Sequence, residues 1–459
     1  MYDILIILIC LAGLMTLAYR GGNLILLAPV MAILAVILAQ GGQILAAFTQ
    51  IFMPAMGGFV IQYFPLFLLG AIFGKLMDAT GSARALAEGI VRILGPQHAI
   101  LAVILSCAAM TYGGVSLFVV AFATYPVAVR LFRQANLPRE LMPATIGLGS
   151  FTFTMSALPG SPSIQNAIPM PFFGTTPFAA PGLGLIAAAV MFFGGWRWLE
   201  WRAARSTGGF VEAEGAAPEP AAEGPMPSFA MAALPLVLVL VLNALFTWVF
   251  IPAMDTSFLA LPLYGEADID DLRGIWSVIA ALSLSILVLI AMNLRHLPRV
   301  FPALDGGTND SLIPIFNTAG LVGFGAVVAS LQGFHLITQR MVELGTENVL
   351  VSLALASSLL AGLTGSASGG MSIALTELGD TYLALAEAAG IAPDLLHRVT
   401  TLATGSLDTL PHNGAVITLL AICGTTHRQS YGPMAVVCIA FPVLALLVVI
   451  LLGTLFGSF

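Results

Sequence analysis

Charged residues are scarce in this chain. Only 8% of its 459 residues are Asp, Glu, Lys or Arg, while 59% are hydrophobic and the mean hydropathy is +0.99. Soluble domains carry about 25% charged residues, so the composition excludes a soluble domain. Lys75 is the one lysine, and no basic stripe exists outside short loops, so no nucleic-acid partner is expected. The composition therefore indicates an all-α polytopic membrane protein surrounded by lipid.

Cysteine is also rare, and its placement excludes a metal or disulfide role. The four cysteines lie inside apolar runs without a CxxC spacing or a paired His (Cys10, Cys107, Cys423 and Cys438). Such cysteines are typical of core packing, so neither metal nor cofactor is expected. GxSxG and HExxH are absent as well, so we do not expect an enzyme. The N-terminus MYDILIILICLAG has an acid where a signal peptide carries positive charge, which favours a retained first span.

Apolar runs of about 17–25 residues predict membrane spans. They lie at Tyr2–Tyr19, Leu24–Gln40, Gly58–Met77, Pro181–Trp201, Ala230–Ile251, Ile275–Asn293, Leu312–Ile337 and Tyr431–Leu455. Ile44–Gly57 is expected to skirt the interface. Asp78–Gly95 carries Arg84, Glu88 and Arg92 at four-residue spacing, which predicts an amphipathic interfacial helix.

Two pairs of short apolar segments surround glycine-rich tips. His98–Thr111 and Val115–Ala128 flank Tyr112–Gly114, while Val349–Thr364 and Gly370–Ala386 flank Gly365–Gly369. Because each segment is short for a span, each pair predicts a re-entrant hairpin that is buried in protein. Two tilted spans are the alternative for the first pair.

Two longer segments combine helical patterns with polar interruptions. GSFTFTMSALPGSPSIQN (149–166) and TTLATGSLDTLPHNG (400–414) share Gly-Ser, a polar run and Leu-Pro. They predict helices broken at mid-depth, which is how secondary transporters build sites from inverted repeats. Gly113-Gly114, Pro138 and Gly149 align with Gly369-Gly370, Pro393 and Gly405 at nearly constant spacing.

The resulting domain plan has two halves. Residues 1–205 form the first, with a hairpin at about 97–130 and a broken helix at about 140–173, and 206–228 form a flexible cytoplasmic linker rich in Ala, Pro, Gly and Glu. Residues 229–459 form the second, with a hairpin at about 347–386 and a broken helix at about 395–423. Ten crossings with both termini outside the inner membrane leave only Arg273, Arg340 and Arg398 among the basic residues on the outer side. This arrangement follows the positive-inside bias.

The hairpin tips and breaks supply the candidate substrate ligands. No Lys or Arg lies within them in the sequence, so backbone amides at half-helix ends and neutral side chains are expected to hold an anion. In the first half the candidates are Gly113, Gly114, Ser116, Ser156, Gly160, Ser161, Gln165 and Asn166. In the second half they are Thr364, Gly365, Ser366, Ser368, Gly369, Ser406, Thr409 and Asn413. The alternative for each hydroxyl is a bond to its own helix carbonyls.

Asp408 and His412 are the candidate proton-coupling pair. A carboxylate within a membrane segment costs roughly 2.5–3.5 kcal/mol on insertion scales and is functional by default. Two alternatives remain open: Asp408 caps the resuming half-helix, or it belongs to a purely structural network. Glu377, Asp380 and His397 rank lower because they lie nearer to predicted membrane faces.

Four motifs resemble the gluconate:proton symporter family across the whole chain. They are YGGVSLFVVAFATYP (112–126), SALPGSPSIQNAIP (156–169), TGSASGG (364–370) and GSLDTLPHN (405–413). The resemblance implies a homodimer in which the hairpins and broken helices move as an elevator, and proton-coupled uptake of sugar acids or short hydroxy acids. Two features of better-known gluconate permeases are missing: a carboxylate in the segment matching VSLFVVAF, and a His-Pro-rich segment matching SALPGSPS. A smaller acid such as 3-hydroxybutyrate therefore competes with gluconate as the expected substrate.

The sequence as a whole predicts a secondary transporter that moves a small organic anion together with a proton. Sodium coupling, through carbonyls and hydroxyls around Thr364–Ser368, and anion exchange are the nearest alternatives. A channel would need a polar stripe along a continuous helix, and an intramembrane hydrolase would use Asp408, His412 and a hydroxyl. Polar residues clustered at breaks favour the transporter.

Overall fold

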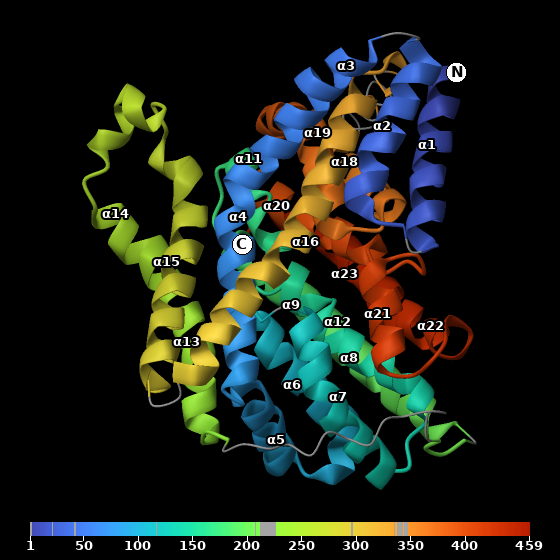
Figure 1. The fold of residues 1–459 in the computed structure, drawn as a ribbon, viewed down its shortest axis with the longest axis vertical. Coiled ribbons are helices and arrows are strands. Elements are labelled where there is room, and N and C mark those ends of the chain that lie inside the picture. The colour runs from blue at the N-terminus through green and yellow to red at the C-terminus, as the bar shows by residue number, and fades with distance from the viewer. Residues whose placement is uncertain are drawn as a thin grey trace.

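The computed structural model is built of helices packed side by side, with no strand in the described residues (Figure 1). It describes all residues except 1, 21, 41–42, 116, 207, 212–225, 295–296, 335, 337–342 and 344–347. Most of the predicted linker and Arg340 lie outside the described residues. Six helices within the described ranges are long and apolar enough to cross a membrane. The prediction of ten crossings additionally needs the two N-terminal helices and the two broken helices to cross.

The first half follows the predicted order of elements. Its helices are α1 (Tyr2–Tyr19), α2 (Leu24–Gln40), α3 (Ile44–Ala47), α4 (Met53–Ala79), α5 (Ser82–Leu94), α6 (Ala99–Tyr112), α7 (Leu117–Gln134), α8 (Met142–Ser150), α9 (Phe153–Ser156), α10 (Ile164–Ala167), α11 (Met170–Phe173) and α12 (Pro181–Ala204). We call α6–α7 hairpin 1 and residues 157–163 break 1. The first two spans end where predicted, because Gly and Asn residues follow them.

The second half repeats the pattern of a helical pair and a broken helix. Its helices are α13 (Phe229–Leu245), α14 (Ile251–Ala253), α15 (Ile269–Met292), α16 (Leu297–Ala329), α18 (Val349–Thr364), α19 (Ala367–Ala388), α20 (Pro393–Leu407), α21 (Gly414–Ile422), α22 (His427–Ala435) and α23 (Phe441–Phe456). We call α18–α19 hairpin 2 and residues 408–413 break 2. α16 begins 15 residues before the predicted Leu312, because its polar first part packs on α4: Gly307 lies where a Cβ would come within 2.6 Å of Ile72 Cα.

Three π-helical turns in the described part of the chain interrupt long helices without ending them. They are η1 (Phe48–Phe52), η4 (Phe246–Phe250) and η8 (Val436–Ala440), and a proline follows each by two residues. Because proline has no N–H, it leaves the carbonyl four residues earlier without its helical partner. One consequence corrects a prediction: Ile44–Gly57 is no separate interfacial stretch, because 44–79 is one continuous 36-residue helix.

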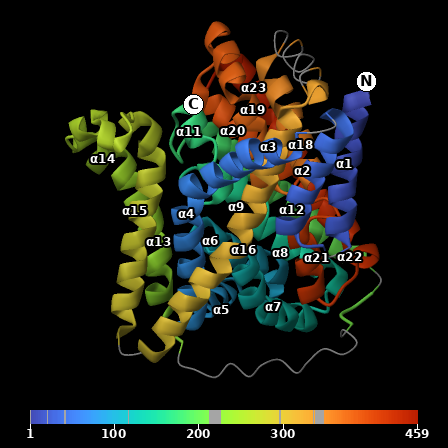
Figure 2. The ribbon, with the colours of Figure 1, turned by 45° about the horizontal axis from the view of Figure 1, so that its top comes forward.

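The two hairpins occupy opposite halves of the molecule. α6 and α7 lie in the lower half and α18 and α19 in the upper half of both views (Figures 1 and 2). The N-terminus lies near the top in both views, and the C-terminus lies near mid-height in Figure 1 and toward the top in Figure 2. The predicted amphipathic helix is α5, which meets α6 at an angle of 111°. Its Glu88 joins Arg84 at 3.2 Å and Arg130 of α7 at 3.5 Å.

The tip of hairpin 2 is shorter than predicted. Gly114 and Gly365 take positive φ angles of 94° and 61° at the two tips, so these are the equivalent glycines. Gly369 and Gly370 lie inside α19, and the predicted alignment of that pair with Gly113-Gly114 is wrong. Ser366 explains the early start of α19, since its hydroxyl accepts from Gly369 N at 3.1 Å and caps the helix.

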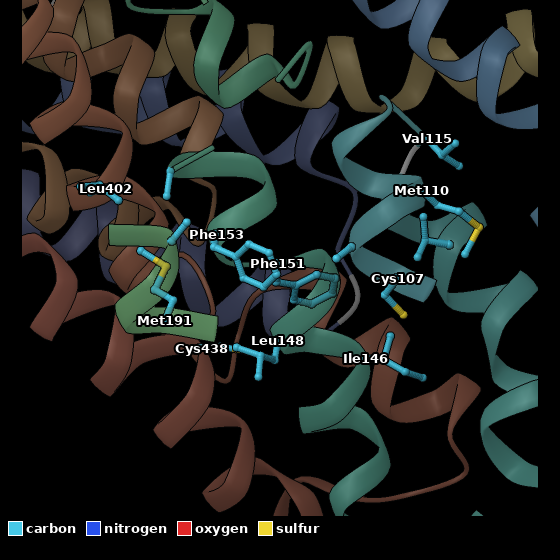
Figure 3. Close-up of a cluster of buried hydrophobic side chains, with 14 of the residues drawn as sticks. Cys107, Met110, Val115, Ile146, Leu148, Phe151, Phe153, Met191, Leu402 and Cys438 are labelled. Atoms are coloured by element: carbon cyan, nitrogen blue, oxygen red, sulfur yellow. The ribbon is translucent and has the colours of Figure 1, made fainter. Parts of the chain in front are cut away.

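The core packs hairpin 1 against the broken helices. Side chains from α6, α8, α9, α12, α20 and η8 gather in one buried cluster, which includes Cys107, Leu148, Phe153, Met191 and Cys438 (Figure 3). The close approach uses Gly149, where a Cβ would stand 2.5 Å from Ile104 O. Hairpin 1 and the first broken helix therefore pack as one body.

Candidate functional site

Asp408 joins break 2 to the tip of hairpin 2. Its Oδ1 accepts from Ala367 N at 2.8 Å and from Asn413 Nδ2 at 2.8 Å. Both hydrogen bonds that the described residues make to this carboxylate reach Oδ1, and the residue is partly exposed. Asp408 therefore lies at the N-terminal end of α19, where the helix dipole favours a negative charge.

Asn413, and not Asp408, caps the resuming half-helix. Asn413 Oδ1 accepts from Ala415 N at 2.6 Å and Val416 N at 3.2 Å. Its Nδ2 donates to Gly365 O at 3.0 Å as well as to the side chain and backbone of Asp408. The capping alternative for Asp408 thus fails for α21, because the short Asn side chain takes that position.

His412 makes a third link between break 2 and hairpin 2. Its Nε2 lies 3.1 Å from Gly362 O, and the ring packs on Gly365, where a Cβ would stand 2.7 Å from Cδ2. In the structure Asp408 and His412 contact different parts of hairpin 2 and share no hydrogen bond within the described residues. Their pairing for proton transfer stays a prediction.

The hydroxyls of hairpin 2 form a chain that leads toward the neighbouring helix. Thr364 Oγ1 donates to Leu360 O at 2.8 Å, Ser366 Oγ lies 3.3 Å from Ser368 Oγ, and Ser368 Oγ lies 3.4 Å from Thr318 Oγ1 of α16. Gly369 packs against Leu321. Ser366 and Ser368 flank Ala367, whose N–H donates to Asp408, so the tip offers hydroxyl oxygens on both sides of that bond in the chain.

Two hydroxyls of the second broken helix are used by the protein itself. Ser406 Oγ donates to Ala403 O at 2.6 Å, which is the back-bonding alternative. Thr409 Oγ1 donates to Cys438 O at 3.1 Å. That carbonyl lies four residues before Pro442, so Thr409 supplies the donor that proline lacks.

Break 1 is the more enclosed of the two. Ser156 and Ser161 are buried, and Ser156 Oγ donates to Thr152 O at 3.1 Å. Gly160 has a φ of 78°, and its carbonyl accepts from Asn243 Nδ2 at 3.0 Å. Gln165 is partly exposed, so its amide remains the most accessible of the predicted ligands here.

Arg398 reaches break 1, although no Lys or Arg lies within a break in the sequence and neutral donors were expected there. The side chain is fully buried, and its guanidinium donates to Ser156 O at 3.1 Å and to Ala179 O at 2.7 Å. The sequence does not predict this contact, because Arg398 and Ser156 are 242 positions apart and a long side chain can reach a segment that is remote in the chain. The guanidinium donates to carbonyls at the end of α9 and just before α12, so Arg398 is buried inside the fold and does not lie in an outer loop.

A second set of bonds ties the same two segments together. His397 is fully buried, with Nδ1 2.7 Å from Thr175 Oγ1 and Nε2 3.2 Å from Asn166 Oδ1. Asn166 Nδ2 donates to Ser161 O and Pro177 O, both at 2.9 Å. His397 is therefore buried and, contrary to expectation, does not face the membrane. Asn166 bonds both to break 1, through Ser161 O, and to α20, through His397.

The tip of hairpin 1 lies on break 1. Tyr112 Oη donates to Pro159 O at 2.7 Å, and Gly114 lies where a Cβ would stand 3.0 Å from Pro162. Gly113 packs on Leu236 of α13. The candidate Ser116 lies outside the described residues. Tyr112 was missed as a site residue, although it directly precedes the predicted Gly-Gly tip.

Among the residues that the structure describes, three side-chain hydrogen bonds join the hairpins and broken helices to the surrounding helices α4, α13 and α16. Tyr63 Oη donates to Ile168 O at 3.1 Å, Asn243 donates to Gly160 O, and Thr318 contacts Ser368. Within the described residues, these three bonds are the polar contacts that a displacement of the hairpins and broken helices past α4, α13 and α16 would break.

Comparison with known proteins decides the family. No family model matches the chain. "Uncharacterized transporter YxjC" of Bacillus subtilis (strain 168) is 45% identical over 449 residues, which cover 94% of this chain and 94% of that protein. The chain belongs to the same transporter family as YxjC. It is accordingly a multi-pass membrane transporter.

Two solved structures share the fold. The Alcanivorax borkumensis YdaH transporter, described as having an unusual topology, aligns with a TM-score of 0.52 and 16% identity over 88% of this chain and 86% of its own. Neisseria gonorrhoeae MtrF, whose structure is said to illuminate a class of antimetabolite efflux pumps, aligns with a TM-score of 0.53 and 12% identity over 91% and 85%. At these identities the likeness concerns the fold alone.

Proposed function

We propose that the protein is a secondary active transporter for proton-coupled uptake of a small hydroxy-monocarboxylate, either a gluconate-like sugar acid or a 3-hydroxybutyrate-like acid. One observation carries the proposal: the Asp408 carboxylate lies between break 2 and the tip of hairpin 2. The resemblance to gluconate:proton symporters and membership of a transporter family support it.

The charges around the breaks argue for coupling. Arg398, the cation that reaches break 1, is engaged with backbone carbonyls and Asn166. An anion that binds near hairpin 2 meets the negative charge of Asp408 in a low-dielectric site, where like charges repel strongly. A proton on Asp408 removes that repulsion, so anion and proton bind together and neither crosses alone.

The hydrogen bonds of Asp408 also suggest how the proton controls the hairpin. Ala367 N, Gly365 O and Gly362 O all belong to hairpin 2, and all bond to side chains of break 2. Charge-assisted bonds are roughly twice as strong as neutral ones. Protonation of Asp408 therefore weakens the hold on hairpin 2, and the hairpins and broken helices then move as an elevator between the surrounding helices.

Sodium-coupled transport is the second candidate. Thr364, Ser366 and Ser368 place hydroxyl and carbonyl oxygens around the tip beside Asp408, and oxygens of this kind suit a hard cation. Anion exchange differs only in coupling. A homodimer in the inner membrane with both termini outside remains part of the proposal.

Uptake into proteoliposomes tests the proposal. Labelled gluconate, 3-hydroxybutyrate, lactate and glycerate are offered with an acid-outside gradient, then with a sodium gradient at equal pH, and then with internal anion alone. We expect accumulation of one acid with the pH gradient only. Accumulation with sodium alone would assign the second candidate, and uptake that needs internal anion would assign exchange.

A further inference from the structure

A cavity of about 90 Å³ lies between α1, α16 and hairpin 2. Leu11 of α1, Phe324 of α16, Ala356 of α18 and Ile373 of α19 line it. It lies at the seam between a smaller hydrophobic cluster, built by α1, α2 and α16, and the larger core that contains hairpin 2. We call it the α1–α18 cavity.

The side chains that line the cavity are almost all apolar. Of the described residues that line the cavity, Thr364 alone has a polar side chain, and its hydroxyl donates to Leu360 O at 2.8 Å. The cavity therefore offers no hydrogen bond to a sugar acid. Apolar cavities of similar order, roughly 150 Å³, stay free of water and bind apolar molecules such as benzene.

The cavity opens on an exposed apolar surface of α1 and α18. Leu8 of α1 and Leu359 of α18 line it and are each 47% exposed, which places them at its mouth. Val351 and Leu355 continue the apolar stripe along α18 at four-residue spacing. Leu11 is 5% exposed, so the cavity runs from this stripe into the interior.

We propose that the α1–α18 cavity binds the end of a membrane lipid's acyl tail. The fold of a membrane transporter places acyl tails against the mouth. An unfilled apolar space forfeits the dispersion contacts of its walls, and an acyl tail restores those contacts without burying a polar group. The size of the cavity suits the terminal part of one tail.

The position of this tail bears on hairpin 2. Thr364 lines the cavity and directly precedes Gly365 at the tip that Asn413 and Asp408 hold. The tail lies between α1 and α16 on one side and hairpin 2 on the other. It therefore fills the seam along which hairpin 2 would slide.

Photo-crosslinking tests the site. The full chain is placed in vesicles of a phospholipid that carries a diazirine near the end of one acyl tail, irradiated, and mapped by peptide mass spectrometry. We expect adducts at the buried residues Leu11 and Ile373 as well as at the exposed Leu355. Ala356→Leu places three further carbon atoms in the cavity and so fills part of it. We expect this variant to lose the adducts at Leu11 and Ile373 and to keep those at Leu355.

Ala354→Leu is the matched control, because Ala354 lies on the same helix and is also buried but does not line the cavity. It should leave the adducts at Leu11 and Ile373 in place. Adducts confined to Leu355 and other exposed residues in the unaltered protein would overturn the proposal, since the cavity would then be empty or filled by a second copy of the chain. Adducts at Leu11 that persist in Ala356→Leu would also overturn it.

Discussion

Asp408 Oδ1 accepts a hydrogen bond from Ala367 N at 2.8 Å, and this bond joins break 2 to the first residue of α19. The two residues are 41 positions apart in the chain. A carboxylate at this point sees the positive end of the α19 dipole, so the bond is strongest when Asp408 is charged. In the proposed mechanism, the charge of Asp408 thereby controls the position of hairpin 2.

Variants of Asn413 distinguish its role as the cap of α21 from its role in holding Asp408 and hairpin 2. Asn413→Ala removes the cap of α21 and the bridge to Asp408, and we expect a loss of about 1 kcal/mol in stability together with a loss of transport. Asn413→Ser keeps a good cap but cannot span to Asp408 and Gly365, so it should restore thermal stability in detergent without restoring uptake. Recovery of both by Ser would mean that Asn413 acts only as a cap.

Arg398 should be a stability residue. Arg398→Met leaves the carbonyl of Ala179 without the guanidinium that donates to it and leaves Ser156 O with the hydroxyl of Thr401 as its donor. Each lost bond to a charged group costs about 1.5–3 kcal/mol. We expect a clearly lower unfolding temperature in detergent. Arg428→Met is the control, since Arg428 is exposed, and it should change little. Equal unfolding temperatures for the two variants would show that the hydrogen bonds of Arg398 beside break 1 do not stabilise the fold.

Gly370 should be required for the packing of hairpin 2. A Cβ at this position would clash with the backbone of Ala361, so Gly370→Ala forces α18 and α19 apart, at about 1–3 kcal/mol. Gly432 also lies in a helix but has open space around its Cβ position, so Gly432→Ala should be neutral or stabilising. Thermal unfolding of both variants checks this. A neutral Gly370→Ala would show that the helices of hairpin 2 are less closely packed.

Local patterns predicted the elements that end at clear signals. α18 begins after Asn348 and ends before Gly365, so both of its bounds follow from the sequence. The first part of α16, before the predicted Leu312, escaped detection because Pro302 and Gly306-Gly307 are typical of a loop, yet these glycines allow close packing on α4. Hydropathy cannot reveal a helix whose polar part is selected by contact with another helix.

The candidate site was predicted only in part, for a similar reason. Asn413 before a glycine and an apolar run is a local capping signal, so its role could have been recognised. The bonds from Arg398 to Ser156 and from His397 to Thr175 span more than 200 residues, and nothing local announces them. The hydroxyls of Ser406 and Thr409, which were candidate ligands, donate to backbone carbonyls of the protein. The role of the other candidate hydroxyls in binding a substrate stays a prediction.

The central claim is that Asp408 carries the coupled proton. Asp408→Asn keeps the size of the side chain and can still accept from Ala367 N, but it cannot exchange a proton. Asp380→Asn, an exposed carboxylate on α19, is the matched control and should accumulate substrate normally.

The most direct measurement is uptake by Asp408→Asn in proteoliposomes with an acid-outside gradient, beside counterflow of the same acid at equal pH. We predict that gradient-driven accumulation is lost while counterflow persists. Accumulation by Asp408→Asn at the level of the unaltered protein would contradict the account.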